Sequence, residues 1–254
     1  MKTKIISALR NIEREKEIKI FYAAESGSRA WGFASPDSDY DVRFLYFHRP
    51  QWYFSLGKRQ DFFNLMSQDA VFDFGGWDLG KTLALLLKGN ISLYEWLHSP
   101  IKYIEGDVCT EFSELAVAYY NPKSLIYSYL SYSKNNYKEQ INADMVKIKK
   151  YLYIFRTLAA CRWIERESTP PPIEMSKLKE MYKPEKGILA FIDELIELKQ
   201  NGKERNAIAR NDGINTWIEN TYEYYKEYAD SLPEPALKEA PLEEFFYRSV
   251  MRSN

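Results

Sequence analysis

The character of this chain changes near residue 107, and that change limits what the chain can fold into. Before residue 107, short apolar runs typical of strands alternate with helical patterns, and after it long amphipathic helical patterns predominate. Apolar residues three and four positions apart predict helices, whereas alternation of apolar and polar residues predicts strands. We therefore expect an α+β fold with two domains, a mixed one over residues 1–106 and an all-helical one over residues 107–254.

The first domain contains three predicted strands, at 18–24, 41–47 and 70–74, the last ended by Gly75 and Gly76. A charged amphipathic helix is predicted over 3–16, and another over 79–88 with Asp78 as its N-cap. In the second domain the patterns predict helices at 107–119, 122–138, 142–166, 174–181, 185–200, 203–210, 213–230 and 242–251.

The first predicted strand runs into Gly27 and Ser28. A strand that ends in small residues and turns into a helix exposes backbone N–H groups, and these groups can bind phosphate. Gly-Ser pairs are also common in ordinary tight turns. On its own, this pair therefore leaves both interpretations open.

Carboxylates follow at once, with Asp39 and Asp41 two positions apart. Residues two apart on a strand share one face, so both side chains could bind the same divalent ions. Asp73 on the third predicted strand suits the role of a third carboxylate, and we prefer it to Asp78 because Asp78 is already expected to cap a helix. Sites of this type suit Mg²⁺, which binds a few carboxylate oxygens together with water and substrate phosphates.

Two other interpretations of the aspartates were considered. Asp37, Asp39 and Asp41 match the start of a calcium-binding EF-hand loop, but position six is Val42 and position twelve is His48, which excludes that motif. A polar surface turn without a ligand is the second alternative.

Taken together, the segments resemble the DNA polymerase beta nucleotidyltransferase superfamily, and the later ones are similar to its branch associated with RNA repair. The matching segments are residues 27–32, 38–43, 73–81, 90–100, 149–156 and 159–164. The resemblance covers about two thirds of the chain, roughly residues 18–175. The chain departs from the superfamily at Trp31, where many members carry a basic residue.

The resemblance implies a mixed sheet with flanking helices, a helical C-terminal domain, and transfer of a nucleotidyl group from an NTP such as ATP to an acceptor hydroxyl, with Mg²⁺ or Mn²⁺. By position, Gly27 and Ser28 would hold the triphosphate. Asp39 and Asp41 would bind metal, and Asp73 would be the third metal-binding and catalytic carboxylate. RNA is the acceptor that this branch suggests.

Cations for the triphosphate are predicted nearby in the sequence, at Arg29, Arg43, Lys81 and Lys88. Arg43 shares a predicted strand face with the aspartates, which suits either a structural ion pair or a substrate contact. On the helix 142–166, a basic face with an aromatic ring is formed by Lys149, Lys150, Tyr153 and Arg156. This face could contact phosphates or RNA, or it could simply be solvated.

Composition excludes several classes of protein. The formal net charge of −1 argues against binding nucleic acid through bulk charge. No segment approaches the roughly 20 apolar residues of a membrane span, and the N-terminal apolar run is interrupted before a signal-peptide core forms. Cys109 and Cys161 lack metal-ligand spacing and are predicted to be buried. We therefore expect a cytoplasmic protein.

The patterns leave two other functions open. One is a catalytically silent module that binds nucleotide or RNA, and the other is an antitoxin-like enzyme that modifies a protein hydroxyl.

Overall fold

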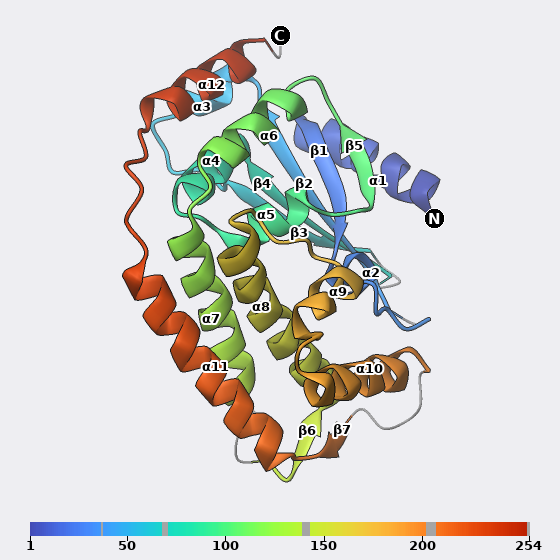
Figure 1. The fold of residues 1–254 in the computed structure, drawn as a ribbon. Coiled ribbons are helices and arrows are strands. Elements are labelled where there is room, and N and C mark those ends of the chain that lie inside the picture. The colour runs from blue at the N-terminus through green and yellow to red at the C-terminus, as the bar shows by residue number, and fades with distance from the viewer. Residues whose placement is uncertain (37, 68–70, 139–142, 202–206, 253–254) are drawn as a thin grey trace. The chain divides into compact units, whose positions relative to one another are not determined.

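The computed structural model describes residues 1–36, 38–67, 71–138, 143–201 and 207–252 (Figure 1). The chain divides into two compact units. Unit 1 comprises residues 1–30, 39–119 and 236–254, and unit 2 comprises residues 31–38 and 120–235. These units are discontinuous in sequence, unlike the division predicted at residue 106. Asp37, considered above for an EF-hand, lies outside the described residues.

Unit 1 is built on a mixed five-stranded sheet, in agreement with the predicted α+β class (Figure 1). Its strands are β1 (Ile18–Ser26), β2 (Tyr40–His48), β3 (Phe62–Met66), β4 (Phe72–Asp78) and β5 (Lys102–Glu105), in the order β3-β4-β2-β1-β5. The β2–β4 pair is parallel and the other pairs are antiparallel. The edge strands β3 and β5 were not predicted, because they are short and contain few buried residues.

The prediction that β4 ends at its two glycines was wrong. The strand runs through Gly75 and Gly76 to Asp78, because side chains of the neighbouring strand β2 fill the space where Cβ atoms would stand. A Cβ on Gly76 would lie well under 3.0 Å from the Phe44 ring, and one on Gly75 would lie 3.1 Å from Arg43 Cδ. These glycines therefore permit close packing between strands.

Helices cover both faces of the sheet. Helix α1 (Lys2–Lys16) packs Ile5, Leu9 and Ile12 into a core with Val42 and Phe44 of β2. On the other face, an aromatic chain runs from β1 to α6 (Cys109–Ala118) and α12 (Ala240–Met251), with ring centroids 5.9 Å apart for Phe21–Phe112 and 6.0 Å apart for Phe112–Phe245. The remaining helices of this part are α2 (Gly27–Trp31), α3 (Pro50–Tyr53), α4 (Leu79–Leu87) and α5 (Ile91–Leu97).

Unit 2 is mainly helical, and α8 is its central element. Residues Tyr151, Leu152 and Ile154 to Cys161 of α8 are all buried, and α8 packs against α7 and α10, while α11 packs against α7 (Figure 1). The elements are α7 (Pro122–Lys138), α8 (Ile148–Glu167), α9 (Met175–Leu178), the 3₁₀ helix η1 (Lys179–Tyr182), α10 (Lys186–Gln200) and α11 (Asp212–Ser231).

Two helix predictions in unit 2 were wrong in part. Residues Met145–Lys147 form strand β6, so α8 begins at Ile148 rather than at 142. Strand β6 pairs with β7 (Ala207–Ala209), which lies in the predicted helix 203–210; residues 203–206 lie outside the described part of the chain. Three-residue strands are too short to show a period, and the pairing joins residues about sixty positions apart.

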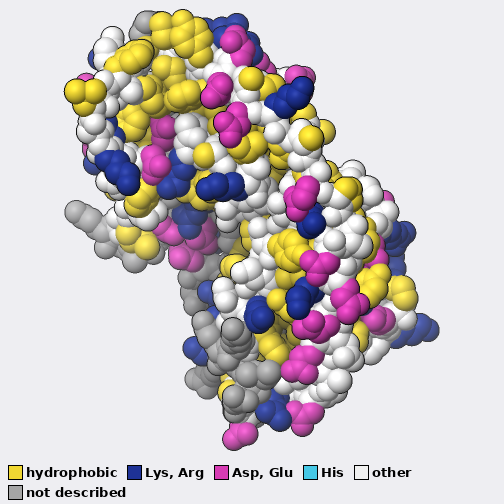
Figure 2. Space-filling view, turned by 90° about the vertical axis from the view of Figure 1, so that its left-hand side faces the viewer, with side chains coloured by type: hydrophobic (Ala, Val, Ile, Leu, Met, Phe, Trp, Pro, Cys, Tyr) yellow, Lys and Arg dark blue, Asp and Glu magenta, His cyan; other side chains and the backbone are white. Residues whose placement is uncertain are grey.

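The surface carries charges of both signs, in keeping with the net charge of −1. Figure 2 shows acidic and basic side chains interspersed over one face of the molecule. Within the described residues, no helix is long and apolar enough to cross a membrane. Both cysteines are buried, as predicted, and neither forms a disulfide.

Candidate active site

Two of the predicted carboxylates meet where β2 and β4 run parallel. The register pairs Asp41 with Asp73, and the guanidinium of Arg43 bridges them: Nη2 lies 3.0 Å from Asp41 Oδ1 and 2.7 Å from Asp73 Oδ2. The three side chains are only 20–29% exposed. Three residues from two strands thus form one compact charged cluster, which consists of the carboxylate pair Asp41 and Asp73 and the arginine between them.

Arg43 is held in place by more than its ion pairs. Its Nη1 donates to the carbonyl oxygen of Asp73 at 3.0 Å and to that of Val42 at 3.3 Å. Gly75, beside it on β4, leaves room for the guanidinium. The structure therefore realises the ion-pair interpretation of Arg43 that the sequence left open.

The turn after β1 brings Gly27 against the Asp41 carboxylate. Gly27 has φ +62°, and a Cβ at this position would lie well under 3.0 Å from Asp41 Oδ2. A side chain here would meet both backbone strain and the Asp41 carboxylate. Ser28 follows as the second residue of α2 and is partly buried.

Arg29 turns toward the segment that contains Asp39. Its Nε donates to the Asp39 carbonyl oxygen at 2.9 Å, and its guanidinium lies 3.9 Å from the centroid of the Tyr40 ring. The side chain of Asp39 itself is exposed and precedes the first residue of β2. Consequently Asp39 and Asp41 do not both stand on the strand, contrary to the expectation from their spacing.

The donor set suits a divalent ion held by few protein oxygens. Across the part of the chain that is described, no group of three or more His, Cys, Asp or Glu side chains is arranged to hold a metal ion. Asp41 and Asp73 do converge on one cation, the Arg43 guanidinium. Two carboxylates completed by substrate phosphates and water are a common arrangement for Mg²⁺, so these residues fit the ion.

Asp78 has the capping role that the sequence predicted. Its Oδ1 accepts from the Gly80 N–H at 2.8 Å, and its Oδ2 accepts from the Tyr53 hydroxyl at 2.6 Å. Burial raises the pKa of Asp78, although both hydrogen bonds oppose that shift. Lys81, predicted to bind nucleotide, pairs with Asp61 at 3.0 Å and lies over the Phe62 ring.

Sequence reasoning missed Glu25, a buried acid next to the Gly27 turn. Its side chain is 1% exposed; Oε1 accepts from the Asp41 N–H at 2.9 Å, and Oε2 accepts from the Tyr103 hydroxyl. Burial raises the pKa of Glu25, and these two hydrogen bonds oppose the shift. The available signal was a glutamate directly after the apolar run of residues 20–24.

Two residues predicted to contact nucleotide, Tyr153 and Arg156, lie against Trp31 in unit 2. The Arg156 guanidinium lies 4.1 Å from the Trp31 ring centroid, and the Tyr153 ring meets Trp31 edge-on at 5.1 Å. Lys150 donates to Asn136 Oδ1 at 2.9 Å. Arg156 is 2% exposed, so it does not belong to a solvated basic face.

Unit 2 also holds the segment that follows Trp31. Lys199 Nζ lies 3.2 Å from Ser35 Oγ, and Gln200 Nε2 lies 3.4 Å from the Gly32 carbonyl oxygen. Residues 31–38 join the Gly27 turn to Asp39 in the chain. Among the described residues, Arg43 thus meets Asp41 and Asp73 in unit 1, and Tyr153 and Arg156 meet Trp31 in unit 2. The contacts of Lys81 and Lys150 are with Asp61 and Asn136 instead.

Comparison with known proteins gives three findings. A model of the "RNA repair pathway DNA polymerase beta family" matches residues 1–248. An uncharacterized protein of Bacillus subtilis (strain 168), YcgL, is 41% identical over 233 residues, which cover 91% of this chain and 89% of that protein. A nucleotidyltransferase-like protein from Exiguobacterium sibiricum 255-15 aligns with 98% of this chain and 80% of its own at 10% identity and a TM-score of 0.32.

Proposed function

Because the chain belongs to the RNA repair pathway DNA polymerase beta family, we propose that it is a metal-dependent nucleotidyltransferase. It moves a nucleotidyl group from an NTP to an acceptor hydroxyl. The observation that carries the proposal is the pairing of Asp41 with Asp73 across parallel strands, beside the Gly27 turn.

In this proposal, Asp41 and Asp73 hold Mg²⁺ or Mn²⁺, and Asp39 contributes from the segment before β2. The ion, when bound there, would neutralise charge on the triphosphate and acidify the attacking hydroxyl. Arg43, which bridges these two carboxylates, would place its positive charge beside the ion and the phosphates. Gly27 and Ser28 present the turn to the triphosphate, because a glycine here leaves the backbone accessible.

The transfer breaks one P–O bond and forms another. The acceptor oxygen attacks the α-phosphorus, and the bond from that phosphorus to the oxygen bridging to the β-phosphorus breaks. Pyrophosphate leaves with the electron pair of that bond. The Asp73 carboxylate accepts the proton of the acceptor hydroxyl and passes it to solvent.

Glu25 acts here as a positioning residue. By accepting the Asp41 N–H, its buried carboxylate fixes the start of β2 relative to the end of β1. Arg156 and Trp31 have a corresponding role for residues 31–38, since their stacking holds the start of that segment within unit 2.

The acceptor that we propose is an RNA end, following the description of the family. A second candidate function is a catalytically silent module that binds nucleotide or RNA. It is favoured by the Arg43 guanidinium, which occupies the space between the two carboxylates.

A labelling experiment separates these functions. The protein is incubated with each labelled NTP, ATP included, with Mg²⁺ or Mn²⁺, and with RNA ends or whole lysate. The proposal expects label on RNA, and it expects loss of labelling in the Asp41→Ala and Asp73→Ala variants. Label on a protein would show that the acceptor is a protein hydroxyl and not an RNA end. Calorimetric binding of NTP without any labelled product would favour the silent module.

The variants need a control for folding. Glu105→Ala suits this purpose, because Glu105 pairs with Lys102 on the edge strand β5 and neither residue is assigned to the site. Full labelling by Asp41→Ala would refute the assignment of the site.

A further inference from the structure

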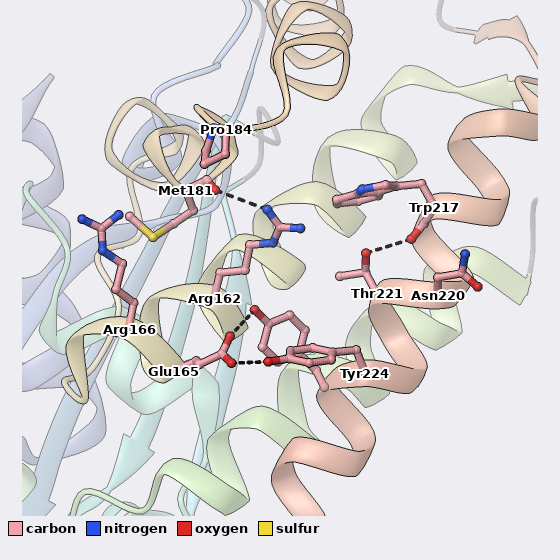
Figure 3. Close-up of a pocket in the computed structure, with 10 residues that line it drawn as sticks. Arg162, Glu165, Arg166, Met181, Pro184, Trp217, Asn220, Thr221 and Tyr224 are labelled. Atoms are coloured by element: carbon pink, nitrogen blue, oxygen red, sulfur yellow. Dashed lines mark hydrogen bonds between the residues drawn. The ribbon is translucent and has the colours of Figure 1, made fainter.

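A cavity in unit 2 has the composition of a small-molecule site. It occupies about 470 Å³ between α8, the turn after η1 and α11 (Figure 3). Small-molecule sites generally span about 300–1,000 Å³, with mainly apolar walls and a few polar groups. None of the residues proposed above for nucleotidyl transfer lines this cavity.

One wall is braced by an ion pair. Arg162 donates from Nη1 to Glu185 Oε2 at 2.5 Å and from Nη2 to Glu185 Oε1 at 3.1 Å, and the Trp217 indole donates to the same Oε1 at 3.1 Å. The guanidinium lies 5.2 Å from the Trp217 ring centroid and 4.9 Å from that of Tyr182. The aromatic surface and the cation at this wall are thus held in fixed positions.

Helix α8 also presents an oriented carboxylate to the cavity, three positions after Arg162. Glu165 accepts hydrogen bonds from the hydroxyls of Tyr224 and Tyr225, the latter at 2.7 Å (Figure 3). Two donors leave further lone pairs on the carboxylate for a ligand. Glu165 is therefore available as a hydrogen-bond acceptor inside the cavity.

Arg162 remains available as a donor. A guanidinium has five N–H donors, and the described bonds of Arg162 use three of them, to Met181 O and to the two oxygens of Glu185. The cavity thus offers a hydrogen-bond donor, a hydrogen-bond acceptor and an aromatic surface within one small volume.

These charges select among ligand classes. A small anion would face the Glu165 carboxylate, and a small cation would face the guanidinium groups of Arg162 and Arg166. A neutral planar ring that has both donor and acceptor edges satisfies the walls without conflict. We propose that this cavity binds a nucleobase with an exocyclic amine, which donates to Glu165 while a ring acceptor receives an N–H of Arg162.

The base could belong to a free nucleotide or to single-stranded RNA. Arg166 also lines the cavity; its side chain is 69% exposed and its Nε pairs with Glu167 at 3.1 Å. Its guanidinium has further N–H groups that could contact a phosphate attached to the base. A phosphate contact would strengthen binding of either source relative to the bare nucleoside.

Calorimetry with cytidine and uridine tests the proposal, because these nucleosides differ chiefly in an amine and a carbonyl at one ring position. The full chain is used in EDTA, and the ligands lack phosphate, so metal-dependent triphosphate binding does not contribute. We expect cytidine to bind about tenfold more tightly than uridine, as one hydrogen bond to a charged group would give. The Glu165→Gln variant should remove this preference.

Further variants complete the test. Tyr224→Phe removes one hydroxyl that orients Glu165 and should weaken the preference for cytidine, even if Glu165→Gln fails to fold. Glu227→Gln is the matched control for Glu165→Gln and should behave as the parent protein, because Glu227 is an exposed carboxylate on α11 that does not line the cavity. Arg166→Ala should weaken the binding of CMP and of a short cytidine-ended RNA but not the binding of cytidine. Whichever of CMP and the RNA binds the parent protein more tightly identifies the natural source of the base.

Equal binding of cytidine and uridine, or binding of neither, would overturn the proposal. So would an undiminished preference in a folded Glu165→Gln variant. Because nucleotidyl transfer is not measured here, these outcomes are independent of whether the protein is an active transferase.

Discussion

Replacing Arg43 by methionine tests whether Asp41 and Asp73 form a cation site. Methionine keeps an apolar stem beside Gly75 but removes the charge and the donors to both carboxylates. The two carboxylates are then left without the bridging cation. Two unit charges on adjacent strands, about 5 Å apart, repel by about 3 kcal/mol at an effective dielectric constant of about 20.

We therefore expect Arg43→Met to lower the free energy of unfolding by about 3 kcal/mol in EDTA. Mg²⁺ should restore much of this loss, since an ion present at about 100 times its dissociation constant contributes about 2.7 kcal/mol. The parent protein should gain less from Mg²⁺, because Arg43 competes with the ion for the same carboxylates.

Urea unfolding with and without Mg²⁺ measures these differences. Arg248→Gln is a suitable control, since Arg248 is paired with Glu111 and Glu244 elsewhere in unit 1. Asp73→Asn in the Arg43→Met background should abolish the response to Mg²⁺. If Arg43→Met gained no more from Mg²⁺ than the parent protein, the reasoning about the cation site would be refuted.

Two further predictions concern Gly27 and Glu185. Gly27→Ala should lower the free energy of unfolding by about 1–2 kcal/mol, because alanine disfavours the left-handed backbone at this position. It should also weaken the stabilisation by Mg²⁺, because the added Cβ would displace Asp41. Gly32→Ala is the control in the same urea assay: with φ +86° and open space around it, it should lower stability without changing the response to Mg²⁺. Burial would raise the pKa of Glu185, but hydrogen bonds led by that from Arg162 outweigh burial and lower it below its usual 4.5. The ionised Glu185 therefore stabilises the fold above pH 4.5, and this contribution is lost as the pH falls through the lowered pKa. Glu185→Gln should thus cost about 1–2 kcal/mol at pH 7 and nothing at a pH below that pKa; a pH-independent difference between the two unfolding curves would contradict this account.

The strength of local signals explains which elements could be predicted. Helices α1 and α4 and strands β1 and β2 were predicted closely, because each buries several residues in a regular period. The cap at Asp78 could also be predicted, because an N-cap interaction joins residues within one turn of helix. Strands β6 and β7 were missed because their partners lie far apart in the sequence.

The candidate site shows the same limit. The type and spacing of Asp39, Asp41 and Asp73 indicated a carboxylate site, and the family match is consistent with that interpretation. The part played by each residue remains a prediction. What the spacing could not show is that Asp39 precedes β2 with an exposed side chain, because the start of a strand depends on pairing with its neighbours.

The sequence alone determined the α+β class, the family and the residue types available for chemistry, because periodicity and short motifs are properties of neighbouring residues. Only the tertiary structure decided that Arg43 bridges Asp41 and Asp73, that Glu25 holds the Asp41 N–H, and that Arg156 stacks on Trp31. It also brought α12 into the unit that contains the sheet. Such contacts join residues from distant parts of the chain, and they depend on strand register and on the space that glycines leave for neighbouring side chains.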